Sequence, residues 1–185
     1  MKKIMAILLC LVLAAGCAAC AAEAADKEVM GTISMGGAFE LRCTVPEGYR
    51  LENVYSDEGR YIGMLTSEDK SSPVMQISIA FEELIAEVAR LNDIDEDGLA
   101  KIAATFQEGD EVEITYMETE HGTKLMVVKE IRDSVDYVDI YTIYRGYEIE
   151  FVLTTPPGAE AQGLTDAQIR TAVKFLSDLD FVEVE

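Results

Sequence analysis

Apolar and polar residues alternate along much of the chain, as they do in strands that bury one face. From residue 38 to residue 45 every second side chain is apolar, and the turn residues Pro46-Glu47-Gly48 follow. The same period of two predicts further strands at 61–65 and 74–81, and two hairpins built from 112–116 with 125–131 and from 135–144 with 147–155. Each hairpin turns at a glycine, His121-Gly122 and Arg145-Gly146, which is a good hairpin signal.

Three stretches follow the helical period instead. Leu84, Ile85, Val88 and Leu91 recur at helical spacing, and so do Leu99, Ile102, Ala103 and Phe106. The third stretch has the clearest start. Thr165 and Gln168 form a capping box, Leu164 and Ile169 flank it as a hydrophobic staple, and the buried face then runs through Val173, Leu176 and Leu179.

Strands, a helical pair, two hairpins and a final helix predict an α+β domain. Its antiparallel sheet has about six strands and is covered by helices. This order resembles the PsbP-like fold. The resemblance is carried by "FELRCTVPEGY" at 39–49, the two hairpins and "LTDAQIRTAVKFLSDLDF" at 164–181. It implies an α/β/α sandwich and an accessory or docking role, often in exported bacterial lipoproteins, and it transfers no catalytic residue.

The N-terminus has the pattern of an export signal. Lys2 and Lys3 precede ten apolar residues at 4–13, too few for a helix that spans a bilayer, which needs roughly 20. The segment "LAAGC" at 13–17 resembles a bacterial lipobox, although Ala14 stands where Leu is usual. The resemblance implies acylation of Cys17, for example with palmitate. The alternative is an ordinary secretory signal cut near residues 22–24.

These features divide the chain into a signal peptide at 1–16, a lipidated N-terminus and tether at 17–37, and one domain at 38–185. Cys43 is the only cysteine of the domain and is expected to be a small buried hydrophobe. A Cys20–Cys43 disulfide is the alternative.

The net charge limits the partners. Without Lys2 and Lys3, 13 basic and 35 acidic side chains remain, a formal charge of −22. Such a chain repels nucleic acids and anionic lipid headgroups, so membrane attachment has to come from the lipid on Cys17. Acidity also favours a basic partner or divalent cations.

One segment looks like the start of a calcium loop. Asp93, Asp95, Asp97 and Gly98 occupy positions 1, 3, 5 and 6 of such a loop, but position 12 is Ala104, where a bidentate Glu closes the cage. The competing interpretation makes Asp93 the cap of a helix with Glu96 as its capping-box partner. It leaves Gly98 unexplained, because glycine inside a helix costs about 1 kcal/mol.

No other motif points to chemistry. His121, the only histidine, is expected at an exposed hairpin tip. The tyrosines of the second hairpin are expected on both strand faces, so they do not form one groove; they are Tyr137, Tyr141, Tyr144 and Tyr147. The sequence therefore predicts no catalytic residue, no cofactor and no metal site.

The resulting hypothesis is a lipid-anchored extracytoplasmic protein of a bacterial cell envelope. It is not an enzyme, and it binds or assembles with an envelope protein that the sequence does not name. The alternatives are a calcium-responsive module that uses residues 93–98 and a hydrolase that works through carboxylates. Oligomeric state stays open.

Overall fold

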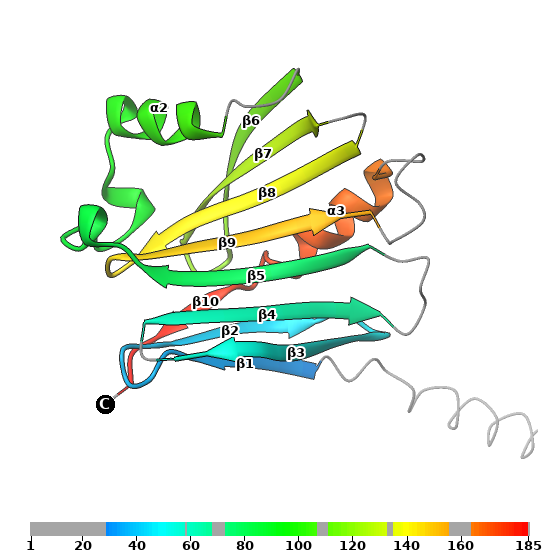
Figure 1. Cartoon of the computed structure of the whole chain (residues 1–185), viewed down its shortest axis with the longest axis horizontal. Helices are drawn as coiled ribbons and strands as arrows, with labels where there is room; N and C mark the ends of the chain where they lie inside the picture. The colour runs from blue at the N-terminus through cyan, green and yellow to red at the C-terminus, as the bar shows by residue number, and fades with distance from the viewer. Residues whose placement is uncertain are drawn as a thin grey trace, which may run out of the picture.

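The computed structural model describes residues 29–57, 59–67, 73–106, 111–132, 135–155 and 164–184 (Figure 1). The expected signal peptide, Cys17, Cys20 and the turn at residues 156–158 lie outside these ranges. The strands are β1 Val29–Ser34, β2 Glu40–Val45, β3 Tyr49–Ser56, β4 Arg60–Ser67, β5 Val74–Phe81, β6 Glu111–Glu118, β7 Lys124–Arg132, β8 Val135–Tyr144, β9 Tyr147–Thr154 and β10 Asp180–Val182. The helical elements are two 3₁₀ turns, η1 Glu83–Ile85 and η2 Leu91–Asp93, and the helices α2 Glu96–Thr105 and α3 Asp166–Phe175.

The strands form two antiparallel sheets. The larger has the order β3-β4-β5-β9-β8-β7-β6, and the smaller has the order β1-β2-β10. Both predicted hairpins are present as β6–β7 and β8–β9. The expectation of an α+β fold on an antiparallel sheet is confirmed, and a second small sheet adds to it.

The main core lies between the small sheet and α3 on one side and the inner face of the large sheet on the other. The small sheet contributes Ile33, Phe39, Leu41, Cys43 and Phe181, the large sheet contributes Ile77, Ile79, Ile140, Ile149 and Phe151, and the C-terminal segment contributes Ala172, Leu176 and Leu179. The alternating burial of β2 and β5 is the pattern that the sequence predicts.

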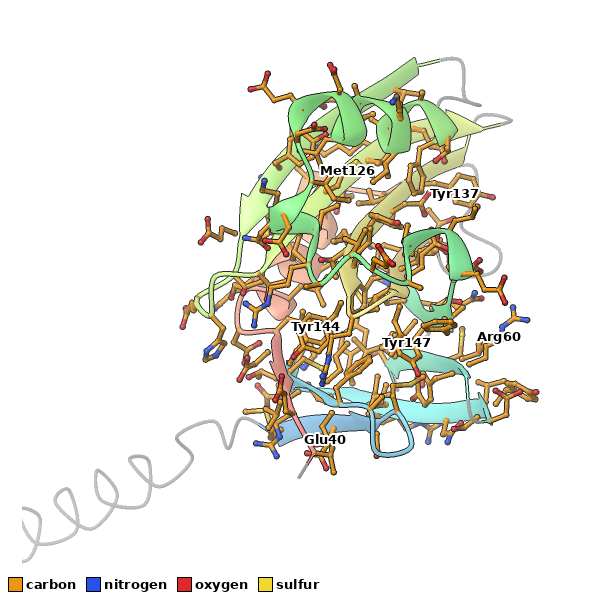
Figure 2. The ribbon with its side chains drawn as sticks, turned by 90° about the vertical axis from the view of Figure 1, so that its left-hand side faces the viewer. Glu40, Arg60, Met126, Tyr137, Tyr144 and Tyr147 are labelled. Atoms are coloured by element: carbon orange, nitrogen blue, oxygen red, sulfur yellow. The ribbon has the colours of Figure 1, made fainter. Side chains whose placement is uncertain are left out.

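A second core lies on the outer face of the large sheet, over β6, β7 and β8. Leu91, Met126, Val128, Tyr141 and Ile143 are buried there. The apolar side of α2 packs on them with Leu99, Ile102, Ala103 and Phe106, as its spacing predicts. Figure 2 shows Met126 beneath α2. Strands β7 and β8 are therefore covered on both faces.

The start of α3 is as predicted. Thr165 accepts a hydrogen bond from the backbone of Gln168, and the Gln168 side chain accepts one from the Thr165 backbone N–H at 2.8 Å. Leu164 is buried and Ile169 packs against the main core. The helix ends at Phe175, a little earlier than the apolar pattern suggests.

The predicted helix at 84–91 is wrong. Only the 3₁₀ turns η1 and η2 occur there, and Leu84 is 97% exposed. The carbonyl groups of Val88 and Ala89 accept hydrogen bonds from the backbone N–H groups of Gly146 and Arg145. Arg90 is extended and forms a β-bridge with Tyr144, so the backbone leaves the helical conformation before Leu91.

The tether predicted at 17–37 is also corrected at its C-terminal end. Residues 29–34 form β1, which pairs with β2 along its whole length, and Ile33 and Met35 are buried. Glycine at position 31 suits this strand, because a β-carbon there would lie 2.8 Å from the Val45 side chain. Strands β3 and β10 have no counterpart among the predicted elements.

Candidate functional site

The most chemically distinctive group is an acidic strip formed by Glu82, Asp139, Glu148 and Glu150. Tyr141 of β8 pairs with Glu150 of β9, and Ala80 of β5 pairs with Glu148. Because side chains two residues apart share a face, Asp139 and Tyr141 lie on the outer face with Glu148 and Glu150. On the β8 side this face is covered by α2, whereas on β4 and β5 it carries half-exposed side chains such as Ile62 and Ser78.

The carboxylates of the strip repel one another. Partial burial raises the pKa of Glu150, and the charges of Glu148 and Asp139 raise it further. Partial burial also raises the pKa of Glu148, as does Glu82, while a hydrogen bond from Tyr141 acts in the opposite direction. Burial and then the charge of Glu148 raise the pKa of the Tyr141 hydroxyl, so it stays a hydrogen-bond donor at neutral pH.

This arrangement favours a cation or a basic group as its ligand. Like charges at the border of a covered surface are costly, and a positive partner relieves the repulsion. Among the described residues no group of three or more histidine, cysteine or acidic side chains is arranged to hold a metal ion. The strip is spread along strands, which suits an extended basic segment better than a single ion.

The segment 93–98 forms two separate caps. Asp95 is the N-cap of α2, and its side chain accepts a hydrogen bond from the Gly98 N–H at 2.8 Å. Asp93 belongs to η2 and accepts from the Arg90 N–H at 3.1 Å. The prediction that an aspartate caps this helix is confirmed, but the cap is Asp95 and not Asp93. Asp93 is the last residue of η2, and Ile94 after it is extended, so α2 begins later than predicted.

Packing explains Gly98, the residue that the capping interpretation left over. A β-carbon at position 98 would lie 2.5 Å from Cγ2 of Ile94 and 3.2 Å from the Asp95 carboxylate. Ile94 is half-buried and packs against the core beneath α2. Glycine therefore lets Ile94 reach the core while Asp95 caps the helix.

His121 and the tyrosines of the second hairpin, which the sequence also singles out, lie in a turn and on the two faces of the large sheet. His121 is exposed beside Gly122, whose φ of +76° makes the hairpin turn. Tyr144 stacks on Phe181 with ring centroids 4.3 Å apart, in the main core, whereas Tyr141 is under α2 with Phe106. The tyrosines thus lie on both faces, as expected.

Cys43 is a free thiol and fully buried, as expected for a small hydrophobe on a strand. Burial raises the pKa of this thiol to about 12, and the charge of Asp178 adds to the effect. The Asp178 carboxylate accepts hydrogen bonds from the N–H and the hydroxyl of Thr44.

Sequence reasoning missed the acidic strip. In a chain with 35 acidic side chains, the positions of Asp139, Glu148 and Glu150 carry no signal by themselves. The signal lies in β9, where Glu148 and Glu150 alternate with apolar Ile149 and Phe151 and so must share one face.

Removing the charge of Glu150 should stabilise the protein at neutral pH. The folded pKa of Glu150 is raised, so its ionisation opposes folding above that pKa and the penalty disappears as the pH falls below the ordinary value. Screening keeps the effect of a half-exposed carboxylate below about 1 kcal/mol, so we expect Glu150→Gln to raise the thermal midpoint at pH 7 by about 1–2 °C.

The same melts at pH 4.5 should show the difference shrinking. Glu87→Gln removes the same charge from an exposed position and controls for the general acidity of the chain. An equal gain from both variants, or a gain from Glu150→Gln that does not depend on pH, would count against mutual repulsion in the strip.

Loss of the α2 cap should cost stability regardless of calcium. We expect Asp95→Ala to lower the free energy of unfolding by about 1 kcal/mol, the usual value of an N-cap. Asp97→Ala, at an exposed position in the first turn, should cost less. Denaturant titrations in millimolar calcium and in chelator should coincide for each protein. A wild-type midpoint that rises with calcium, and does not rise in Asp95→Ala, would restore the calcium interpretation.

No helix in the described part of the chain is both long and apolar enough to cross a membrane. No protein-family model matches the chain, and no curated protein matches it.

Proposed function

We propose that this protein is a lipid-anchored, extracytoplasmic domain that binds a basic partner protein at a bacterial cell envelope and catalyses no reaction. The acidic strip is the observation that supports binding most directly. It places three carboxylates, Glu82, Glu148 and Glu150, around Tyr141, at the border between a covered and an open part of one sheet face. A positively charged segment of a partner that lies across these carboxylates would offset their repulsion.

The anchor rests on the sequence around Cys17. Eleven residues separate Cys17 from the first residue of β1, and a fully extended chain of that length spans at most about 40 Å. The domain would therefore stay close to the lipid surface. The formal charge of −22 keeps the domain itself from adhering to anionic headgroups and leaves its surface available to a protein.

The PsbP-like resemblance is consistent with this role. A large antiparallel sheet with α2 packed on one face and α3 on the other suits an α/β/α arrangement, and the β1-β2-β10 sheet is an addition to it. We take the resemblance as support for an accessory function and transfer no residue role from it.

One observation favours a carboxylate-dependent hydrolase, namely the raised pKa values of Glu148 and Glu150. An acid–base pair needs two groups whose pKa values are pushed apart, so that one is protonated while the other is charged. Here both values move in the same direction, and both side chains are half-exposed on a strand. The geometry therefore supports binding better than proton transfer.

The anchor is tested by metabolic labelling with radioactive palmitate. We expect the full-length protein to be labelled and to fractionate with membranes. Cys17→Ala should lose the label and the membrane association, while Cys20→Ala should keep both. Labelling that persists in Cys17→Ala would contradict acylation at that residue.

The strip is tested with a hexalysine peptide titrated into the purified Cys17→Ala chain and followed by NMR. We expect weak, salt-sensitive binding that shifts the amide signals of Tyr141, Glu148 and Glu150. Each exposed charge pair contributes about 0.2–1 kcal/mol, so neutralising Glu148 and Glu150 together should weaken binding about threefold or more. The matched control, Glu118→Gln with Glu120→Gln, should have a smaller effect. Equal losses in both double variants would show only a diffuse charge effect.

A further inference from the structure

The segment 82–90 wraps the tip of the β8–β9 hairpin and is held there by its backbone. The Glu82 N–H donates to the Gly146 carbonyl at 3.0 Å, the Gly146 N–H donates to Val88 at 3.0 Å, and the Arg145 N–H donates to Ala89 at 2.8 Å. Gly146 has a φ of +80°, and a β-carbon there would lie 2.8 Å from the Ala86 backbone. The segment is thus fixed at both ends against a tight turn.

This fixed segment and the end of β5 expose apolar side chains that are close together in the sequence. Leu84 is 97% exposed and Phe81 is 46% exposed. The Phe81 ring and Ala86 both lie against Gly146, and the Phe81 ring contacts Tyr147 edge-on with centroids 5.4 Å apart. We call Phe81, Leu84 and Ala86 the apolar knob. A single exposed leucine is ordinary, but this one lies on a backbone that is already ordered and has an exposed aromatic neighbour.

Acidic groups surround the apolar knob. Glu82, Glu83 and Glu87 are exposed on the same segment, and the charges of Glu82 and Glu148 act on each other, which joins this border to the acidic strip. The arginines of the segment and the turn are otherwise engaged. Arg90 lies over the Tyr144 ring, and Arg145 pairs with Glu183 at 3.6 Å and contacts the Ala38 carbonyl. The border of the knob is therefore negative.

The negative charge around the apolar knob determines which kind of partner can bind there. A second copy of this chain would bring the same carboxylates against one another, and an anionic membrane would repel them. A protein that offers an apolar pocket bordered by lysine or arginine would bury Leu84 and pair with the glutamates at once. Apolar side chains on a backbone that is already ordered lose little conformational entropy when a partner buries them, which favours such a contact.

We propose that the apolar knob is the anchor by which this protein docks into an apolar pocket with a basic rim on a partner protein. The inference deepens the proposed function, on which it rests, by assigning the contact surface and the chemistry of the partner. Figure 1 shows the segment after β5 at one end of the molecule, and β1 begins at the opposite end. The knob therefore lies at the end of the domain opposite to the start of β1, the strand that leads toward Cys17. The end that carries the knob faces the viewer in Figure 2, where Tyr144 and Tyr147 lie between α2 and the small sheet.

The test is photo-crosslinking in the bacterium that produces the protein, with benzoylphenylalanine at position 87 of the full-length chain. We expect one discrete protein adduct. Leu84→Asp should reduce its yield at least tenfold, and Glu83→Lys should reduce it severalfold. Val54→Asp changes an apolar side chain that is 61% exposed on β3 and should leave the yield unchanged. Equal thermal midpoints of the variants confirm that Leu84→Asp folds, as the exposure of Leu84 predicts.

Mass spectrometry of the adduct identifies the crosslinked peptide, which should carry apolar residues flanked by lysine or arginine. The proposal is overturned by the absence of an adduct, by an adduct with a second copy of this chain, by a yield that does not depend on Leu84, or by an acidic crosslinked peptide. Palmitate labelling of the same cells reports the anchor separately. A Leu84-dependent adduct without labelling contradicts only the lipid anchor, and labelling without the adduct contradicts only the knob.

Discussion

Burial of strand β8 on both faces is the constraint on which the rest of the structure depends. Val138 and Ile140 face the main core, while Tyr141 and Ile143 face the core beneath α2. Strand β9, its neighbour, is buried on the inner side only and turns Glu148 and Glu150 outward. The change from a covered to an open face thus falls between two adjacent strands. The acidic strip lies on this border, which explains why its carboxylates are partly desolvated and close to one another.

The sequence predicts those elements whose local signals agree with their burial. The hairpins β6–β7 and β8–β9 have alternation and a glycine turn, and α3 has a capping box followed by an apolar face. Strand β3 has little alternation in its burial, because it is an edge strand with a bulge near Val54. Strand β10 is only three residues long, and pairing with β2 alone makes it a strand. The segment 84–91 has helical spacing, but extended Arg90 forms a β-bridge with Tyr144 of β8 and breaks the helical conformation.

The sequence of β9 indicates that Glu148 and Glu150 share a face, but it does not show which carboxylates of the neighbouring strands they meet. Which carboxylates meet across strands depends on register, and here Tyr141 pairs with Glu150 while Ala80 pairs with Glu148. A shift of one residue would send both glutamates into the main core, so the apolar partners Ile149 and Phe151 fix the outward direction of the charges. At 93–98 the sequence carried the correct chemistry, a carboxylate that caps a helix, but it could not show that η2 would take Asp93 first.

The buried thiol of Cys43 can report local opening of the small sheet. Its partner across β1 is Gly31, and its high pKa keeps it in the unreactive thiol form while the sheet is closed. A thiol reagent can reach it only after the main core around the small sheet opens locally, so the rate of modification measures the free energy of that opening. Because β1 is also the strand that leads toward Cys17, tension on an anchored chain would act first on the pairing of β1 with β2. In the proposed lipid-anchored form, the reactivity of Cys43 would therefore record tension that reaches β1.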